Sequence, residues 1–158
     1  MAENGLPAIV PMISYENVAE AADWLAEAFG LRETVRMTAD DGSASHVELR
    51  LGDGVVMLGR PGPDYQSPKR HRESCESARK MYEVPYVIDG VHAYVDDVDA
   101  HFERAKAAGA TMLSEPEDTP WGDRHYRVED LEGHRWMFAQ HVRDVAPEEW
   151  GAEQKEER

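Results

Sequence analysis

The most regular pattern of apolar and polar positions lies at residues 91–109, where a strand-like segment runs directly into a helix-like one. Every second residue from 91 to 95 is apolar, which is the period of a half-buried strand. Asp97 is a favourable helix cap and Gly109 is a favourable helix end. The apolar stripe of this predicted helix is Val98, Phe102, Ala105 and Ala108.

A second copy of this unit lies near the N-terminus. Residues 8–14 predict a strand at a sheet edge, because Pro11 has no N–H to donate to a neighbouring strand. Asn17 is a favourable helix cap, and Gly30 is placed to end the helix. The apolar stripe of this helix is Val18, Ala22, Leu25 and Phe29. Aligning Asn17 with Asp97 gives an internal repeat with an offset of 80 residues.

Further strands are predicted after each helix. Those of the first half are residues 31–37, 46–51 and 55–59. Those of the second half are residues 111–114, 125–129 and 135–142. The pattern therefore predicts a single domain built from two βαβββ modules, residues 8–59 and 91–142. Residues 60–90 connect the modules, and residues 143–158 form a charged tail that frays or forms a solvated helix.

The connection at residues 60–90 is rich in proline and glycine near its start and includes a possible short helix at residues 73–83. It also carries residues 69–72, KRHR, which is the only basic cluster in an acidic chain. We expect a surface linker, and the alternative is a lid or a swapped hinge across a ligand cleft.

The overall charge narrows the class of partner. The 158 residues include 32 acidic and 17 basic side chains, so the net charge is −15. Nucleic acids and anionic membranes require a positive surface, so neither is an expected partner. The negative charge suits a cationic ligand, or simply solubility. No run approaches the length of a membrane span, and the N-terminus does not look like a signal sequence. With Cys75 as its single cysteine, the chain has no intrachain disulfide, and we expect a cytoplasmic protein.

Three stretches carry a family resemblance. They are residues 94–110 (YVDDVDAHFERAKAAGA), 121–124 (WGDR) and 130–142 (DLEGHRWMFAQHV), with a weaker echo at 17–31 (NVAEAADWLAEAFGL). They resemble the glyoxalase and bleomycin-resistance group of the vicinal oxygen chelate superfamily, over residues 8–142. The resemblance implies an α+β fold in which the two modules form an open eight-stranded cleft. It also implies a homodimer.

The resemblance also implies where metal-dependent members would hold their metal, on the first and last strands of each module. The corresponding residues are Val10, Met57, Gly90 and Met137. None is the histidine or glutamate that those enzymes use, and a methionine thioether is a weak ligand for the divalent metals concerned. We therefore expect no metal and no cofactor. A displaced metal site is the alternative, and its candidates are His46, Glu48, His92 and His141.

The expected activity is metal-independent binding of a small molecule. The predicted cleft-facing residues are Met12, Met57, His92, Tyr94 and Met137. Methionine adapts to irregular ligands and aromatic rings stack on planar ones, although such residues on strands often only fill a core. Further walls are expected from Trp121 and Tyr126, and Arg124 is expected to hold a ligand anion or an inner carboxylate. The chain is thus similar to the members that sequester a planar or cationic antibiotic without changing it.

Two other functions remain open. The first is an enzyme of the same superfamily, an isomerase, lyase or dioxygenase, with a displaced metal or a histidine-based site. His92 is the best candidate for acid–base catalysis in such a site. The second is an interaction module that works through residues 69–72 or through the tail. The sequence has neither a glycine-rich phosphate loop nor a nucleophile elbow, and Cys75 lacks an evident base.

Overall fold

The computed structural model describes residues 5–156. The first module consists of β1 (Met12–Ser14), α1 (Val18–Phe29), β2 (Arg32–Thr38), β3 (Ala44–Leu51) and β4 (Gly54–Gly59). The second module consists of β5 (Gly90–Tyr94), α4 (Val98–Ala107), β6 (Thr111–Met112), β7 (Glu117–Asp118), β8 (Asp123–Glu129) and β9 (Arg135–His141). Between the modules lie α2 (Pro68–Ser74) and α3 (Glu76–Met81), and a short 3-10 helix, η1 (Pro147–Trp150), follows β9.

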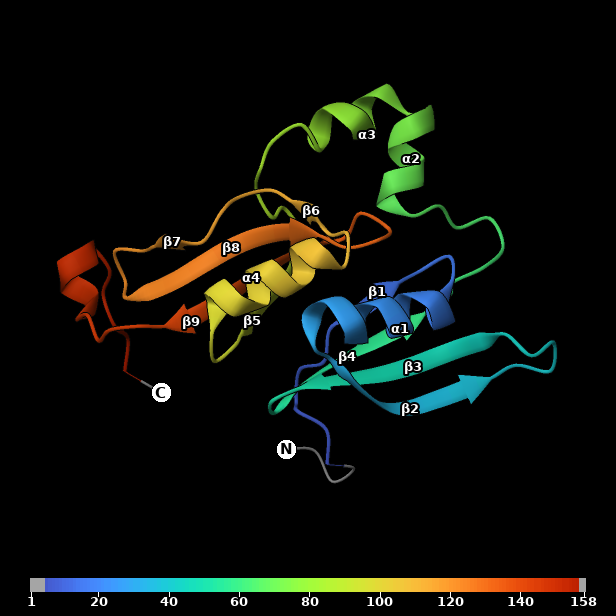
Figure 1. Cartoon of the computed structure of the whole chain (residues 1–158), viewed down its shortest axis with the longest axis horizontal. Helices are drawn as coiled ribbons and strands as arrows, with labels where there is room; N and C mark the ends of the chain where they lie inside the picture. The colour runs from blue at the N-terminus through green and yellow to red at the C-terminus, as the bar shows by residue number, and fades with distance from the viewer. Residues whose placement is uncertain (1–4, 157–158) are drawn as a thin grey trace.

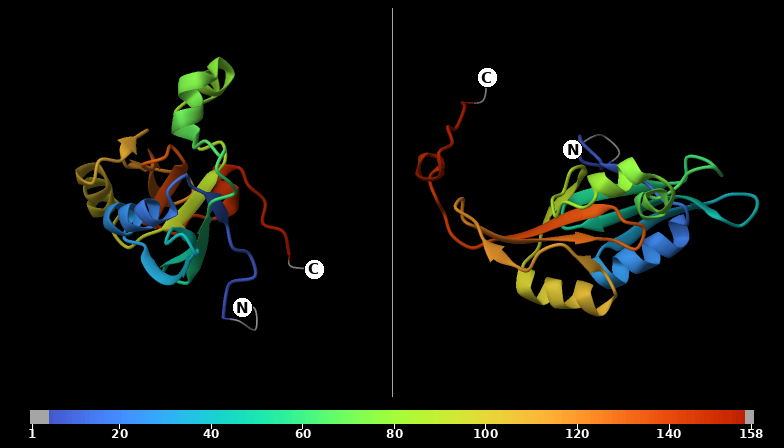
Figure 2. Two further views of the ribbon diagram at one scale, coloured as in Figure 1. Left: turned by 90° about the vertical axis from the view of Figure 1, so that its right-hand side faces the viewer. Right: turned by 90° about the horizontal axis from the view of Figure 1, so that it is seen from above.

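Each module forms its own sheet. The strand order is β1-β4-β3-β2 in the first sheet and β5-β9-β8-β6 in the second, with β7 paired to β8. The β1–β4 and β5–β9 pairs are parallel, and the other pairs are antiparallel. Figures 1 and 2 show α1 and α4 in contact with each other on one side of the two sheets. The predicted α+β fold with two βαβββ modules is confirmed, and its sheets stay open rather than closing into a barrel.

The helix boundaries follow from the predicted local signals. The Asn17 side chain accepts a hydrogen bond of 3.1 Å from the Glu20 backbone, and the Asp97 side chain accepts one of 3.0 Å from the Ala100 backbone. Gly30 ends α1 in the left-handed conformation, with φ of 73°. The two predicted apolar stripes face the core, although Ala108 is only partly buried.

Several strand and helix boundaries differ from those predicted. The first strand begins at Met12 rather than at residue 8, after Pro11, and the strand predicted at 125–129 already begins at Asp123. The strand predicted at 111–114 ends at Met112, and β7 had not been predicted. The helix predicted at 73–83 is two helices, because Ser67 caps a first one with Pro68 in its first turn and the chain turns extended at Cys75.

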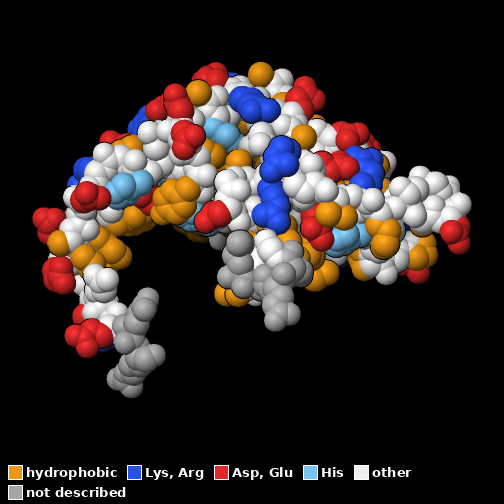
Figure 3. All heavy atoms as spheres, turned by 90° about the horizontal axis from the view of Figure 1, so that it is seen from below, with side chains coloured by type: hydrophobic (Ala, Val, Ile, Leu, Met, Phe, Trp, Pro, Cys, Tyr) orange, Lys and Arg blue, Asp and Glu red, His pale blue; other side chains and the backbone are white. Residues whose placement is uncertain are grey.

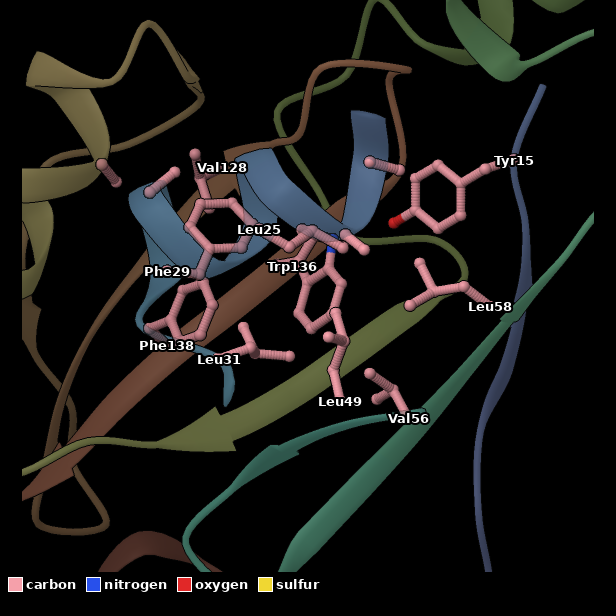
Figure 4. Close-up of a cluster of buried hydrophobic side chains, with 14 of the residues drawn as sticks. Tyr15, Leu25, Phe29, Leu31, Leu49, Val56, Leu58, Val128, Trp136 and Phe138 are labelled. Atoms are coloured by element: carbon pink, nitrogen blue, oxygen red, sulfur yellow. The ribbon is translucent and has the colours of Figure 1, made fainter. Parts of the chain in front are cut away.

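The two modules share one hydrophobic core (Figure 4). The ring of Phe29 on α1 lies 5.4 Å from that of Trp136 and 4.8 Å from that of Phe138, both on β9. His101 on α4 joins the modules through Nε2, which lies 2.9 Å from the Phe29 carbonyl, and its Nδ1 lies 2.7 Å from the Tyr126 hydroxyl within the second module. Tyr126 is completely buried in this core. Its predicted role as a wall of the ligand site is therefore wrong.

The buried Asp130 carboxylate also connects the two modules. Asp130 accepts hydrogen bonds from the Tyr15 hydroxyl of the first module and from the Trp136 indole of the second. It also accepts bonds from the backbone N–H groups of Glu132 and His134, at 3.0 Å each. Burial raises the pKa of the Asp130 carboxyl, while these donors and nearby His134 oppose that rise. Asp130 thus accepts from four donors, and the hydrogen bond from the His134 N–H is the one that is only partly buried.

The connection between the modules is docked onto the protein rather than free. Arg135 on β9 donates to the backbone carbonyls of Tyr82, Val84 and Tyr86, just after α3. Both Arg135 and Arg72 on α2 also bind the Glu129 carboxylate, at 3.1 and 3.0 Å. The predicted basic cluster at residues 69–72 is thus partly occupied by internal ion pairs, which weakens its role as a partner-binding surface.

Candidate functional site on the second sheet

The second sheet packs one face against α1 and α4 and turns the other away from them, and the connection between the modules covers one end of that second face through Arg72 and Arg135. Tyr126, Val128, Trp136 and Phe138 are buried in the core. The residues that alternate with them point away from the helices, because successive side chains of a strand lie on opposite faces. Figure 3 shows that the molecule is arched and hollow on this side, with hydrophobic side chains along the hollow. We call the outward side of β5, β8 and β9 the open face.

Tyr94 lies at the centre of the open face. Its side chain is 59% exposed, and its hydroxyl donates a hydrogen bond of 2.8 Å to the buried Asp123 carboxylate. Tyr94 is on β5 and Asp123 is on β8, so the phenol ring crosses the intervening strand β9. The residue of β9 paired with Tyr94 is Ala139, whose short side chain leaves room for the ring. This hydrogen bond to Asp123 raises the pKa of the Tyr94 hydroxyl.

His92 lies beside Tyr94 on the same strand face. The two ring centres are 5.2 Å apart with a tilt of 37°, and His92 is paired with Met137 on β9. His92 is exposed at the surface, yet the protein around it removes part of its solvent and lowers the pKa of its imidazole. The neutral imidazole is therefore favoured.

His141 extends the polar end of the open face. Its Nδ1 lies 3.2 Å from the Asp123 carboxylate, and its Nε2 lies 2.7 Å from the Asp144 carboxylate. Asp144 is the larger cause of a raised pKa at His141, and Asp123 is the second. On the open face, the exposed rings of Tyr94 and His141 therefore lie beside the buried Asp123 carboxylate.

Trp121 stands at the edge of this face, in the turn before β8. It is 40% exposed, and its ring centre lies 5.9 Å from that of His125 and 6.1 Å from that of Trp150 in η1. The turn requires Gly122, which has φ of 100° and where an added Cβ would lie 2.0 Å from the Arg143 carbonyl oxygen. The WGDR stretch thus sets the position of Trp121.

The predicted ligand-binding residues are distributed over both sheets. His92, Tyr94 and Met137 share the open face, with Trp121 at its rim. Met12 and Met57 are paired with each other in the first sheet, where Met12 is 79% exposed. A cavity of about 400 Å³ lies between the sheets and is lined by Ile9, Leu49, Val56, His92, Tyr94 and Trp136, among others.

Arg124 does not belong to the open face. Its guanidinium binds Asp99 on α4 at 2.9 Å and Asp118 on β7 at 3.1 Å, so it points to the helix side of the sheet. The alternation of side chains along β8 predicts which of its residues face the helices and which face the open side. Arg124 and Tyr126 have the parity of the core residue Val128, whereas Asp123 and His125 have the opposite parity.

The positions that hold metal in metal-dependent relatives do not suit a metal here. The Val10 side chain has no donor atom, and the side chains of Met57 and Met137 each offer only a thioether sulfur. At Gly90 an added Cβ would lie 2.2 Å from the Arg135 carbonyl oxygen, so no ligating side chain fits. Within residues 5–156, moreover, no three His, Cys, Asp or Glu side chains are arranged to hold a metal ion. The four candidates for a displaced metal site lie on different sheets. His46 and Glu48 are on β3 of the first sheet, and His92 and His141 are on β5 and β9 of the second.

Comparison with known proteins agrees with the fold. The model of the Glyoxalase/Bleomycin resistance protein/Dioxygenase superfamily matches residues 9–138. The chain belongs to this superfamily. Similar proteins include an uncharacterised protein from Mycobacterium tuberculosis and one from Mycobacterium bovis. Each is 36% identical over 149 residues, which cover 94% of this chain and 83% and 93% of the two relatives.

Solved structures of similar proteins extend this comparison. TioX from Micromonospora sp. ML1 is 37% identical, with a TM-score of 0.64 over 86% of this chain and 99% of TioX. The fosfomycin resistance protein FosX from Listeria monocytogenes has a TM-score of 0.58 over 90% of this chain and 96% of FosX. FosX is only 13% identical to this chain, so the similarity between the two structures shows the fold alone. Among the described helices, none is long and apolar enough to cross a membrane.

Proposed function

We propose that this superfamily member binds a planar, cationic small molecule on the open face, without a metal and without transforming it. The observation that carries the proposal is Tyr94, whose exposed ring is fixed next to the buried Asp123 carboxylate by a hydrogen bond of 2.8 Å from its hydroxyl. A flat cation gains from both groups, because its ring stacks on the aromatic side chain and its charge approaches the carboxylate.

The composition of the face supports the same ligand class. His92 and Met137 add a neutral ring and a polarisable thioether next to Tyr94, and Trp121 adds a second exposed aromatic side chain. The net charge of −15 favours the approach of a cation by long-range attraction. Sequestration of a planar antibiotic is the biological role that we propose for such binding.

Binding of methylene blue, a planar cationic dye, tests this proposal. We expect saturable binding by fluorescence titration, and we expect Tyr94→Ala to weaken it about tenfold, because one aromatic contact contributes about 1.4 kcal/mol. Met81→Ala is the matched control, since Met81 is an exposed apolar side chain on α3. Its affinity is expected to equal that of the unaltered protein. Absence of saturable binding, or equal losses in the two variants, would refute the proposal.

One observation favours the enzyme alternative. The lowered pKa of His92 favours its neutral imidazole, and a neutral imidazole on an exposed sheet face, 5.2 Å from the Tyr94 ring, suits metal-independent proton transfer. Mass spectrometry of a bound ligand before and after incubation separates the two functions. An unchanged mass and proton-exchange pattern supports sequestration, and a changed one supports catalysis.

We also propose that two copies form a homodimer that covers the apolar side chains on the hollow side. Ile9, which precedes β1, and Met12, which begins it, are 86% and 79% exposed. Neighbouring exposed apolar side chains of this kind mark a surface for association. Light scattering is expected to give about twice the chain mass of 17.8 kDa. The double variant Ile9→Glu/Met12→Glu is expected to be monomeric, while Met81→Glu stays dimeric. A monomeric unaltered protein at tens of micromolar would contradict this.

A further inference from the structure

His125 contains a buried atom without a hydrogen-bonding partner. Its Nδ1 is enclosed by the protein, and among the described residues it is the one buried side-chain nitrogen or oxygen left unpaired. The His125 side chain as a whole is only 10% exposed. Burying a polar atom without a partner loses its bonds to water and gains nothing in return. Such an atom therefore calls for a functional explanation.

Strand pairing places His125 next to the proposed ligand site. His125 lies on the outward side of β8, and it is paired with Ala139 on one side and with Glu117 on the other. It is thus in the same row across the sheet as Tyr94, which is also paired with Ala139.

The neighbouring carboxylate decides which nitrogen carries the proton. The Nε2 atom of His125 lies 3.5 Å from the Glu117 carboxylate, whereas Nδ1 faces no acceptor and no donor. The hydrogen of the neutral imidazole is therefore favoured on Nε2, and Nδ1 keeps its lone pair as an acceptor. A ligand that reaches this atom must bring an N–H or O–H group.

We infer that His125 selects the ligand, because its Nδ1 accepts a hydrogen bond from an N–H group of the bound planar cation. This inference rests on the function proposed above. Trp121 packs edge-on against the His125 ring and is 40% exposed in a turn, so it is the side chain that moves to admit the ligand. Asp123 then provides attraction for the charge, and His125 distinguishes cations that carry N–H groups from those whose nitrogens are fully alkylated.

Two dyes with the same ring system test this inference. Thionine carries two amino groups on a phenothiazinium ring, and methylene blue carries dimethylamino groups at the same positions and has no N–H. We expect the unaltered protein to bind thionine at least about tenfold more tightly, a difference worth about 1.4 kcal/mol. His125→Phe is expected to bind both dyes equally, because it keeps the ring against Trp121 and removes both nitrogens.

Two further variants locate the effect at one atom. In His125→Asn the amide oxygen occupies the place of Nδ1, so the preference for thionine is expected to persist. In His125→Gln the amide occupies the place of Nε2, so the preference is expected to disappear. The melting temperature of His125→Phe is expected to change little, because the lost Nδ1 has no bond in the free protein and the lost contact of Nε2 is a 3.5 Å contact with the exposed Glu117. A purely structural histidine would instead give a less stable variant with unchanged dye preference.

The outcomes separate this inference from the proposed function. Equal affinity for the two dyes in the unaltered protein, or a preference that survives in His125→Phe, overturns selection by His125 and leaves binding of planar cations intact. Failure of both dyes to bind overturns the proposed function, and the selection by His125 falls with it.

Discussion

Arg135→Met is expected to lower the free energy of unfolding by about 3–5 kcal/mol, which is the usual cost of removing one partner from a buried ion pair. Arg135 is 3% exposed, and without it the buried Glu129 carboxylate keeps only Arg72 as a cationic partner. The carbonyls of Tyr82, Val84 and Tyr86 lose their donor at the same time. Urea denaturation measures the loss.

Two comparisons make this prediction specific. Arg79→Met removes an exposed arginine from α3 and is expected to change stability by no more than about 0.5 kcal/mol. Arg135→Lys keeps the charge but not the planar fork, so an intermediate loss is expected. Limited proteolysis of Arg135→Met is expected to cut faster within residues 82–86, because that segment is no longer held. A loss below about 1 kcal/mol would show that other contacts hold the connection.

Asp130→Ala is expected to destabilise the protein by about 3–5 kcal/mol, because the loss leaves several buried donors unpaired at about 1–3 kcal/mol each. The donors are the Tyr15 hydroxyl, the Trp136 indole and the backbone N–H groups of Glu132 and His134. Thermal and urea unfolding, monitored by tryptophan fluorescence, measure the effect at the ring that loses its bond.

The control for this variant is another aspartate in a turn. Asp53→Ala changes an exposed aspartate between β3 and β4 and is expected to shift stability by no more than about 0.5 kcal/mol. Asp130→Asn keeps the shape and one acceptor oxygen but turns an NH₂ group toward donors, so an intermediate loss is expected. If Asp130→Ala were as stable as Asp53→Ala, the carboxylate would not fasten the two modules.

Much of the candidate site could be predicted from the sequence. The wrong predictions concern which face of β8 a residue occupies. His92, Tyr94 and Met137 were placed correctly on one face, because alternation along β5 and β9 is unambiguous. Arg124 and Tyr126 were placed on the ligand side, although the parity of Val128 puts them on the helix side. His125 was not singled out, since nothing in its sequence context shows that a buried nitrogen lacks a partner.

The sequence by itself determined the α+β class, the repeated βαβββ modules, the helix caps and the buried stripes. These features depend on local propensity and on side-chain period, both of which act between residues close along the chain. Only the tertiary structure decided that residues 60–90 dock through Arg135, that Asp130 joins the modules, and that Tyr94 reaches Asp123 across Ala139. These contacts join residues brought together by strand pairing and packing, and no spacing along the chain encodes the partner that each buried polar group will meet.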